Sequence, residues 1–439
     1  MNKQIKISKT TPVESFYIIV CGMFKYDTKA INQKEFWSLY THWQNRINKG
    51  DYQATFNYFN SSYYDGYLNN VFPEIRHDKS RRDELDPKFL NHLTNKSLIK
   101  NRLDIGLMIN SEKTVSCFIE FADIYLFPHG NGIFSIKLSL DDDNLNLGKI
   151  SDFINKVRQL NSIVKIDKKE IKLKDFIDDI IFKPLNSKED WTYYNPKLKS
   201  YNIIDVKKQI SEDELNYLLY DMGNVAPIGS AKGDGVYAPS DEYLKNQMEN
   251  NKLSVFKNWS AISLFDTFTK ISWTFPDTVK SWEYDYFHIY IHCLHLKFYM
   301  YLTNSKISDV TIVTKETENI RDDFIEFIND YYQTQISYKF LPDLIQDKLL
   351  YALEIHSEIQ MMETKIQRIN EHAQEKRERN MNFVLMVITF LGVFSLIHDL
   401  SNWIVKMGSP IDVVFPWISS GIGVAIITSI FILFKLRKK

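Results

Sequence analysis

The sequence is short of the residues and motifs that mark several common protein classes. Of its 439 residues only three are cysteines, Cys21, Cys117 and Cys293, and they lie far apart in the chain. Their number and spacing exclude a cysteine-based zinc ribbon and fit a reducing cytoplasm. No N-terminal apolar run resembles a secretory signal. We therefore expect the N-terminal part of the chain to stay in the cytoplasm.

Neither sign of charge is in excess. The chain has 54 Lys and Arg against 55 Asp and Glu, for a net charge of −1. Such a balance argues against a nucleic-acid-binding surface over the whole chain, although local basic patches can still bind a phosphate ligand. Enzyme motifs are missing too, because the sequence has no Gly-x-Ser-x-Gly elbow, no Walker pair and no nucleophile with a recognisable partner. We do not expect an enzyme.

Long apolar runs are absent until the C-terminal part of the chain, where there are two. They predict a first transmembrane helix at 381–400 and a second at 413–434, since a bilayer core needs roughly 20 apolar residues. The alternative is a pair of buried core helices. Lys and Arg gather before the first run and in the tail 435–439, but not in the loop 401–412. Basic residues stay in the cytoplasm, so we expect both termini there and the loop outside.

The first apolar segment carries a stripe of residues on one helical face. The stripe consists of Asn382, Met386, Thr389, Val393 and Leu396, which recur at threes and fours. A polar group in hydrocarbon is costly unless it faces protein or water. The stripe therefore indicates either a pore lining built by several subunits or a helix-packing face. Two helices cannot enclose a channel, so a pore requires an oligomer.

The segment before the first membrane helix predicts a stalk. Apolar residues recur at threes and fours across 341–380, as in a coiled coil, and the pattern runs on into the apolar segment without Gly or Pro. We expect one continuous helix, which packs on neighbouring subunits or folds back on the head. Residues 1–340 form that head, a cytoplasmic α/β sensor domain.

Within the head, the pattern predicts strands at 15–24, 115–126 and 132–140, the last two joined by a turn at 128–132. Helices are expected at 34–48, from about 147 to 160 after a cap at 141–143, and at 317–332. This order predicts a mixed sheet with flanking helices.

A glycine-rich stretch at 223–235 is the most unusual part of the head. Glycine permits close approach of backbone to phosphate, and a lysine adds charge. The candidate ligand-binding residues there are Gly229, Lys232, Gly233 and Gly235; a plain mobile loop is the alternative.

Three histidines, His288, His292 and His295, share one face of a predicted aromatic helix. Two His at this spacing can bind zinc. However, core or subunit-contact histidines fit the pattern better, and no metal ligand or catalytic residue is assigned.

The C-terminal arrangement resembles the CorA superfamily. A long cytoplasmic helix that leads into a first membrane helix, a short outside loop, a second membrane helix and a basic tail, Lys435–Lys439, carry the resemblance. It implies a homopentamer with a CorA-like cytoplasmic funnel, and a first membrane helix that lines the pore. The family's Gly-Met-Asn motif is absent, and His398–Trp403 stands in its place.

The missing motif and the large head resemble the divergent CorA-like membrane effectors associated with type III CRISPR. This resemblance implies an ion channel of the bacterial inner membrane that acts in antiviral defence. It further implies that a nucleotide second messenger such as SAM-AMP opens this channel, and that no nucleic acid is a direct partner. The alternatives are a CorA-type transporter of divalent cations such as Mg²⁺ and a membrane-anchored nucleotide-processing enzyme.

Overall fold

The chain divides into two compact units. The computed structural model describes residues 8–28, 39–40, 52–71, 88–95, 98, 103–110, 113–140, 142, 144–166, 169–183, 190–233, 235, 238–273, 281–308, 315–406, 421 and 423. The first unit comprises Met1–Thr311 and Glu318–Met362, and the second comprises Ile312–Thr317 and Glu363–Lys439.

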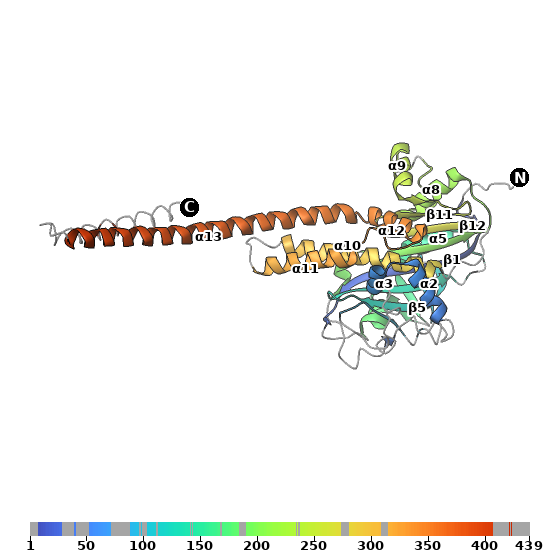
Figure 1. Ribbon diagram of the computed structural model, residues 1–439. Helices are drawn as coiled ribbons and strands as arrows, with labels where there is room; N and C mark the ends of the chain where they lie inside the picture. The colour runs from blue at the N-terminus through green and yellow to red at the C-terminus, as the bar shows by residue number, and fades with distance from the viewer. Residues whose placement is uncertain are drawn as a thin grey trace. The chain divides into compact units, whose positions relative to one another are not determined.

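One mixed sheet forms the centre of the first unit (Figure 1). Its described strands lie in the order β10-β11-β12-β9-β1-β6-β5-β4-β7-β8, and β3 joins β2 to β5. Among these described strands only β9 and β12 pair in parallel. The strands are β1 (Val13–Lys25), β2 (Leu39–Tyr40), β3 (Asn91–Asn95), β4 (Leu103–Met108), β5 (Thr114–Leu126), β6 (Asn131–Leu140), β7 (Ile163–Ile166), β8 (Lys169–Lys172), β9 (Lys199–Val206), β10 (Lys252–Leu253), β11 (Trp259–Leu264) and β12 (Thr267–Trp273).

Helices cover both faces of this sheet. On one face Ile18 and Ile204 pack in the core with Phe153 of α5. On the other face Tyr201 lies under the start of α10, where its hydroxyl donates to the Trp282 carbonyl oxygen at 2.9 Å. Successive side chains of a strand point to opposite faces of the sheet, and both faces are covered here. The sequence of β1 is therefore an almost continuous apolar run. The helices are α2 (Tyr52–Ser62), α3 (Asp65–Val71), α5 (Leu147–Val157), α6 (Leu173–Ile177), α8 (Glu212–Gly223), α9 (Asp241–Asn251), α10 (Tyr286–Ser308), α11 (Lys315–Tyr331), α12 (Phe340–Ala352) and α13 (Ile355–Lys406).

The predicted fold class is confirmed at this level: an α/β head with a mixed sheet and flanking helices precedes one long apolar helix. The strands predicted at 15–24, 115–126 and 132–140 correspond to β1, β5 and β6. Gly130, at φ +76°, closes the turn between the last two. The predicted second membrane helix and basic tail lie outside the described residues, apart from positions 421 and 423.

Two local predictions were wrong. Leu39 and Tyr40, expected in a helix, pair with β3 as a short strand, so sheet pairing overrides their helical pattern; the rest of 34–48 is outside the described residues. Helix α5 is capped by Asn146, whose side chain accepts from the Lys149 N–H, and not by the acidic run before it. Asn146 is the residue directly before the first helical one, where a cap must lie.

The prediction of an uninterrupted stalk helix was also wrong. Helix α12 ends at Ala352, Glu354 adopts φ +57°, and α13 begins at Ile355. Ile345 and Leu349 of α12 are fully buried, and the first unit extends to Met362. Packing in the core therefore ends α12 where the sequence has no Gly or Pro. At its other end α13 runs to Lys406, so the first six residues of the predicted outside loop, 401–406, are helical.

A buried carboxylate near the start of α10 should make stability depend on pH. Asp285 accepts hydrogen bonds from Tyr58, at 2.8 Å, and from Tyr63, yet burial raises its pKa to about 6. Because its folded pKa lies above the unfolded value, the stability it contributes is complete below about pH 4 and is lost as pH rises to about 6. Asp285→Asn should therefore gain up to about 3 kcal/mol relative to the wild type between pH 4 and pH 7.

Chemical denaturation of the full-length protein in detergent at both pH values measures this gain. Asp322→Asn, on the exposed surface of α11, is the matched control and should show no such change. A pH-independent difference between Asp285→Asn and the wild type would contradict the prediction.

Candidate functional site

The C-terminal half of α13 is apolar and largely exposed. Among the described residues α13 is the one helix long and apolar enough to cross a membrane, with mean hydropathy 2.1 in its most apolar window and none of that window buried. Large side chains such as Met381, Ile388 and Leu391 are more than half exposed. An apolar surface of this extent marks contact with lipid or with other protein chains.

The predicted stripe on α13 divides into two parts. Met386, Thr389 and Val393 line a cavity of about 290 Å³ together with Gly423, whereas Asn382 and Leu396 are exposed and do not line it. The Thr389 hydroxyl donates to the Leu385 carbonyl oxygen at 2.8 Å. Its polarity is thus satisfied within the helix and does not by itself require a water-filled pore.

Gly423 lies close to α13. A Cβ at this position would overlap the ring of Phe394. Small residues let helices approach closely, so Gly423 permits a close contact with Phe394 of α13.

The glycine-rich loop is folded around a carboxylate of its own chain. The N–H groups of Gly229 and Ala231 donate to Asp221, at 2.7 and 2.8 Å. Burial raises the pKa of Asp221 to about 6. Lys232 is paired with Glu214. The donors expected to hold a ligand phosphate therefore already hold carboxylates.

Two further glycines of this loop, Gly233 and Gly235, lie in open surroundings. A Cβ added at either position would meet no side chain of the described residues within 4 Å. They offer space but no charged group. The loop as a ligand site stays a prediction with little local support.

The three histidines of α10 pack among aromatic rings. His295 stacks on Phe127 with 3.6 Å between ring centroids, and His292 meets Tyr67 edge-on at 5.3 Å. Burial lowers the pKa of His292 to about 4, so its ring is neutral at pH 7. The ring centroids of His288 and His92 are 5.6 Å apart. The described part of the chain holds no cluster of three metal-ligating side chains, and these rings serve the packing of α10.

A second cavity, of about 440 Å³, opens where α5, β9 and the β11–β12 turn meet. We call it the basic pocket. Three cations and one anion line it: Arg158, Lys197 and Lys199 against Asp266. Its other lining residues are Asn155, Gln159, Pro196, Gly223, Asn224, Val225, Leu264, Phe265 and Thr267.

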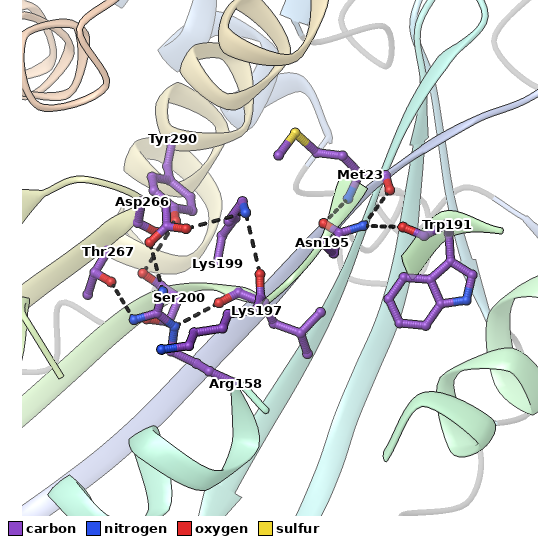
Figure 2. Close-up of polar contacts among 11 residues, drawn as sticks. Met23, Arg158, Trp191, Asn195, Lys197, Lys199, Ser200, Asp266, Thr267 and Tyr290 are labelled. Atoms are coloured by element: carbon purple, nitrogen blue, oxygen red, sulfur yellow. Dashed lines mark hydrogen bonds and ion pairs between the residues drawn. The ribbon is translucent and has the colours of Figure 1, made fainter. Parts of the chain in front are cut away.

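Two nearly buried cations share the single carboxylate of this pocket (Figure 2). Asp266 lies 2.7 Å from an Arg158 guanidinium nitrogen and 3.3 Å from Lys199 Nζ. Arg158 also donates to the Leu198 carbonyl oxygen and the Thr267 hydroxyl, at 2.7 and 3.0 Å. Burial lowers the pKa of Lys199 despite Asp266. The pocket thus keeps an excess of positive charge that one carboxylate does not neutralise.

A buried asparagine fixes the segment that carries the two lysines. The Asn195 side chain donates to the carbonyl oxygens of Met23 and Trp191, both at 2.7 Å, and accepts from the Met23 N–H at 2.8 Å (Figure 2). These bonds join the segment just before β9 to β1. Lys197 and Lys199 therefore project from a backbone that is held on the sheet.

Backbone strain gathers at the rim of the basic pocket. Val225 and Phe265 line it, and they have φ +56° and +50°. A branched or bulky residue in this region is a genuine outlier, and such outliers cluster at functional sites. Phe265 occupies a hairpin turn, where Gly or Asn is usual, and its ring is 65% exposed.

A chain of contacts links the basic pocket to α13. The Tyr290 hydroxyl of α10 donates to the Asp266 carbonyl oxygen at 2.6 Å (Figure 2). Two helical turns further along α10, Lys297 pairs with Glu358 of α13 at 2.6 Å. Residues i and i+7 lie on one side of a helix, so α10 joins the pocket directly to the beginning of the long helix.

None of the charged residues of the basic pocket was singled out from the sequence. They come from three separate segments, so no local motif joins them. The only signal was Gly223, at the edge of the glycine-rich stretch, which does line the pocket. A Cβ on Gly223 would lie 2.8 Å from Leu264, so this glycine permits close packing of α8 on β11.

Comparison with known proteins gave no relative for this chain. No family model matches it, and neither the curated proteins nor the solved structures include a match.

Proposed function

We propose that the protein is a homo-oligomeric membrane pore that opens when a nucleotide binds in its cytoplasmic head. In the arrangement we propose, two helices from each chain cross the inner membrane of a bacterium and the heads form a CorA-like funnel. Opening dissipates ion gradients and arrests the cell, a role suited to antiviral defence.

The observation that carries this proposal is the continuity of α13. Ile355, Ile359 and Met362, in its first turns, are buried within the first unit. The same helix continues to Lys406 through the uncovered apolar segment. A helix without a break transmits a displacement of one end to the other, so a change in the head reaches the membrane segment.

Oligomerisation follows from the number of membrane segments. Two helices cannot enclose an aqueous path, so the path must lie between copies of the chain. Asn382 and Leu396 are exposed in the single chain, which leaves them free to face such a path. Gating further requires that the ligand bind the open and closed states with different affinities.

Reconstitution in liposomes tests the proposal. Full-length protein is placed in vesicles loaded with potassium and a membrane-potential dye, and AMP, ATP or SAM-AMP is added on the side of the head. We expect potassium efflux that depends on one of these nucleotides. The absence of efflux with all three, or Mg²⁺ uptake that needs no nucleotide, would overturn the proposal, the second result in favour of a transporter.

A further inference from the structure

We infer that the basic pocket is the ligand site of the head, and that it takes a ligand with a phosphate group and a flat aromatic ring. The phosphate lies against Arg158, Lys197 and Lys199, and the ring lies on Phe265. The assignment rests on the proposed function for its role in gating, but the binding itself is independent of any pore.

Charge argues for the phosphate. The side chains of Arg158 and Lys199 are only 9% and 10% exposed, and they share the one carboxylate of Asp266. A buried charge without full compensation is costly, and hydrogen bonds from charged donors to an anion are strong. Two N–H groups of the Arg158 guanidinium remain after its three bonds within the described chain. A phosphate at this place supplies the missing negative charge and accepts those donors.

Lys197 adds a solvent-exposed cation to the pocket. It is exposed and lines the same pocket. Within the described part of the chain its ammonium group makes no ion pair. An exposed lysine beside a hydrogen-bonded arginine suits a phosphate, since arginine gives direction and lysine adds charge.

Shape argues for the ring. Phe265 is held at a positive φ that costs about 1–2 kcal/mol for an L-residue, and this strain places a largely exposed ring at the mouth of a charged pocket. Any nucleobase can stack on such a ring, and the stacking contributes about 1–3 kcal/mol to binding. The volume of about 440 Å³ falls within the usual range of small-ligand sites, roughly 300–1,000 Å³.

Contacts along α10 connect the basic pocket to α13. A phosphate competes with Asp266 for Arg158 and Lys199, and the carbonyl oxygen of Asp266 anchors Tyr290. Occupancy of the pocket therefore acts on α10 at Tyr290, and through Lys297 and Glu358 on the start of α13.

Binding is tested on full-length protein in detergent by titration calorimetry with three probes: AMP, adenosine and inorganic phosphate. We expect AMP to bind more tightly than either of its parts. Lys197→Ala should weaken AMP and phosphate by about 10- to 100-fold and leave adenosine unchanged. Phe265→Ala should weaken AMP and adenosine by about 5- to 100-fold and leave phosphate unchanged.

Both substituted residues are exposed, so these variants keep the fold, and the equally exposed Lys208→Ala is the matched control. No AMP binding by the wild type, or equal binding by all variants, would overturn the site. If only Lys232→Ala loses AMP binding, the ligand site lies in the glycine-rich loop and not in the basic pocket. If the wild type binds AMP but shows no efflux from liposomes, the proposed function is overturned and the pocket remains the ligand site. If the wild type shows efflux but Lys197→Ala binds AMP as tightly as the wild type, the pocket is overturned as the ligand site and the proposed function remains.

Discussion

Replacing Lys137 with methionine is expected to destabilise the head by about 3–5 kcal/mol. Lys137 lies on the central strand β6 and is only 4% exposed. Its ammonium group is 2.5 Å from Glu120 and 2.7 Å from Glu283. The substitution removes a buried cation shared by two carboxylates, one of them, Glu283, only 6% exposed, and this accounts for the size of the loss. Thermal and chemical unfolding of the detergent-solubilised protein measure it.

A triple variant separates charge from packing. Lys137→Met combined with Glu120→Gln and Glu283→Gln removes the two carboxylate charges as well and retains similar volumes, so it should recover most of the lost stability. If the triple variant is as unstable as the single one, Lys137 stabilises the head through the packing of its side chain and not through its charge. Glu283 precedes α10, so this ion pair also fastens the start of that helix to the sheet.

Replacing Glu371 with proline is expected to abolish nucleotide-dependent efflux while AMP binding remains. Glu371 is exposed in the middle of α13, between the head and the apolar segment. Proline inside a helix removes a backbone hydrogen bond and costs about 3 kcal/mol or more, with a kink. The head keeps all of its contacts, but the helix no longer transmits a displacement.

Glu371→Ala is the matched control, because among the described residues it loses only the hydrogen bond with Gln367 and alanine is a good helix former. It should conduct as the wild type does. Efflux and its nucleotide dependence are measured in liposomes, and AMP binding by calorimetry on the same preparations. Normal gating by Glu371→Pro would show that α13 is not the route of coupling.

Local patterns predicted those parts of the fold that depend on local interactions. The hairpin of β5 and β6 was recognisable because Asn131-Gly132 follows an apolar run and Gly130 permits a positive φ. In contrast, the end of α12 has no such residue, and burial of Leu353 and Ile355 imposes the bend.

The basic pocket could not be predicted for a different reason. Arg158 ends a helix, Lys199 begins a strand, and Asp266 lies in a turn. Each is unremarkable among 54 basic and 55 acidic residues. The parallel pairing of β9 with β12 brings Lys199 close to Asp266, and the end of α5 places Arg158 beside them. The pocket moreover lies where these two strands begin, whereas the usual rule for parallel strands points to the opposite edge.

Glu354, between α12 and α13, offers a means of tuning sensitivity. Its side chain is exposed, but its backbone has φ +57°, which glycine adopts without penalty. Strain that is present in one state of a switch and relieved in the other shifts the balance between them. About 1 kcal/mol changes that balance roughly fivefold. In the proposed pore, substitutions at this one position would therefore set the nucleotide concentration at which it opens, while the residues of the basic pocket and of the apolar segment of α13 stay the same.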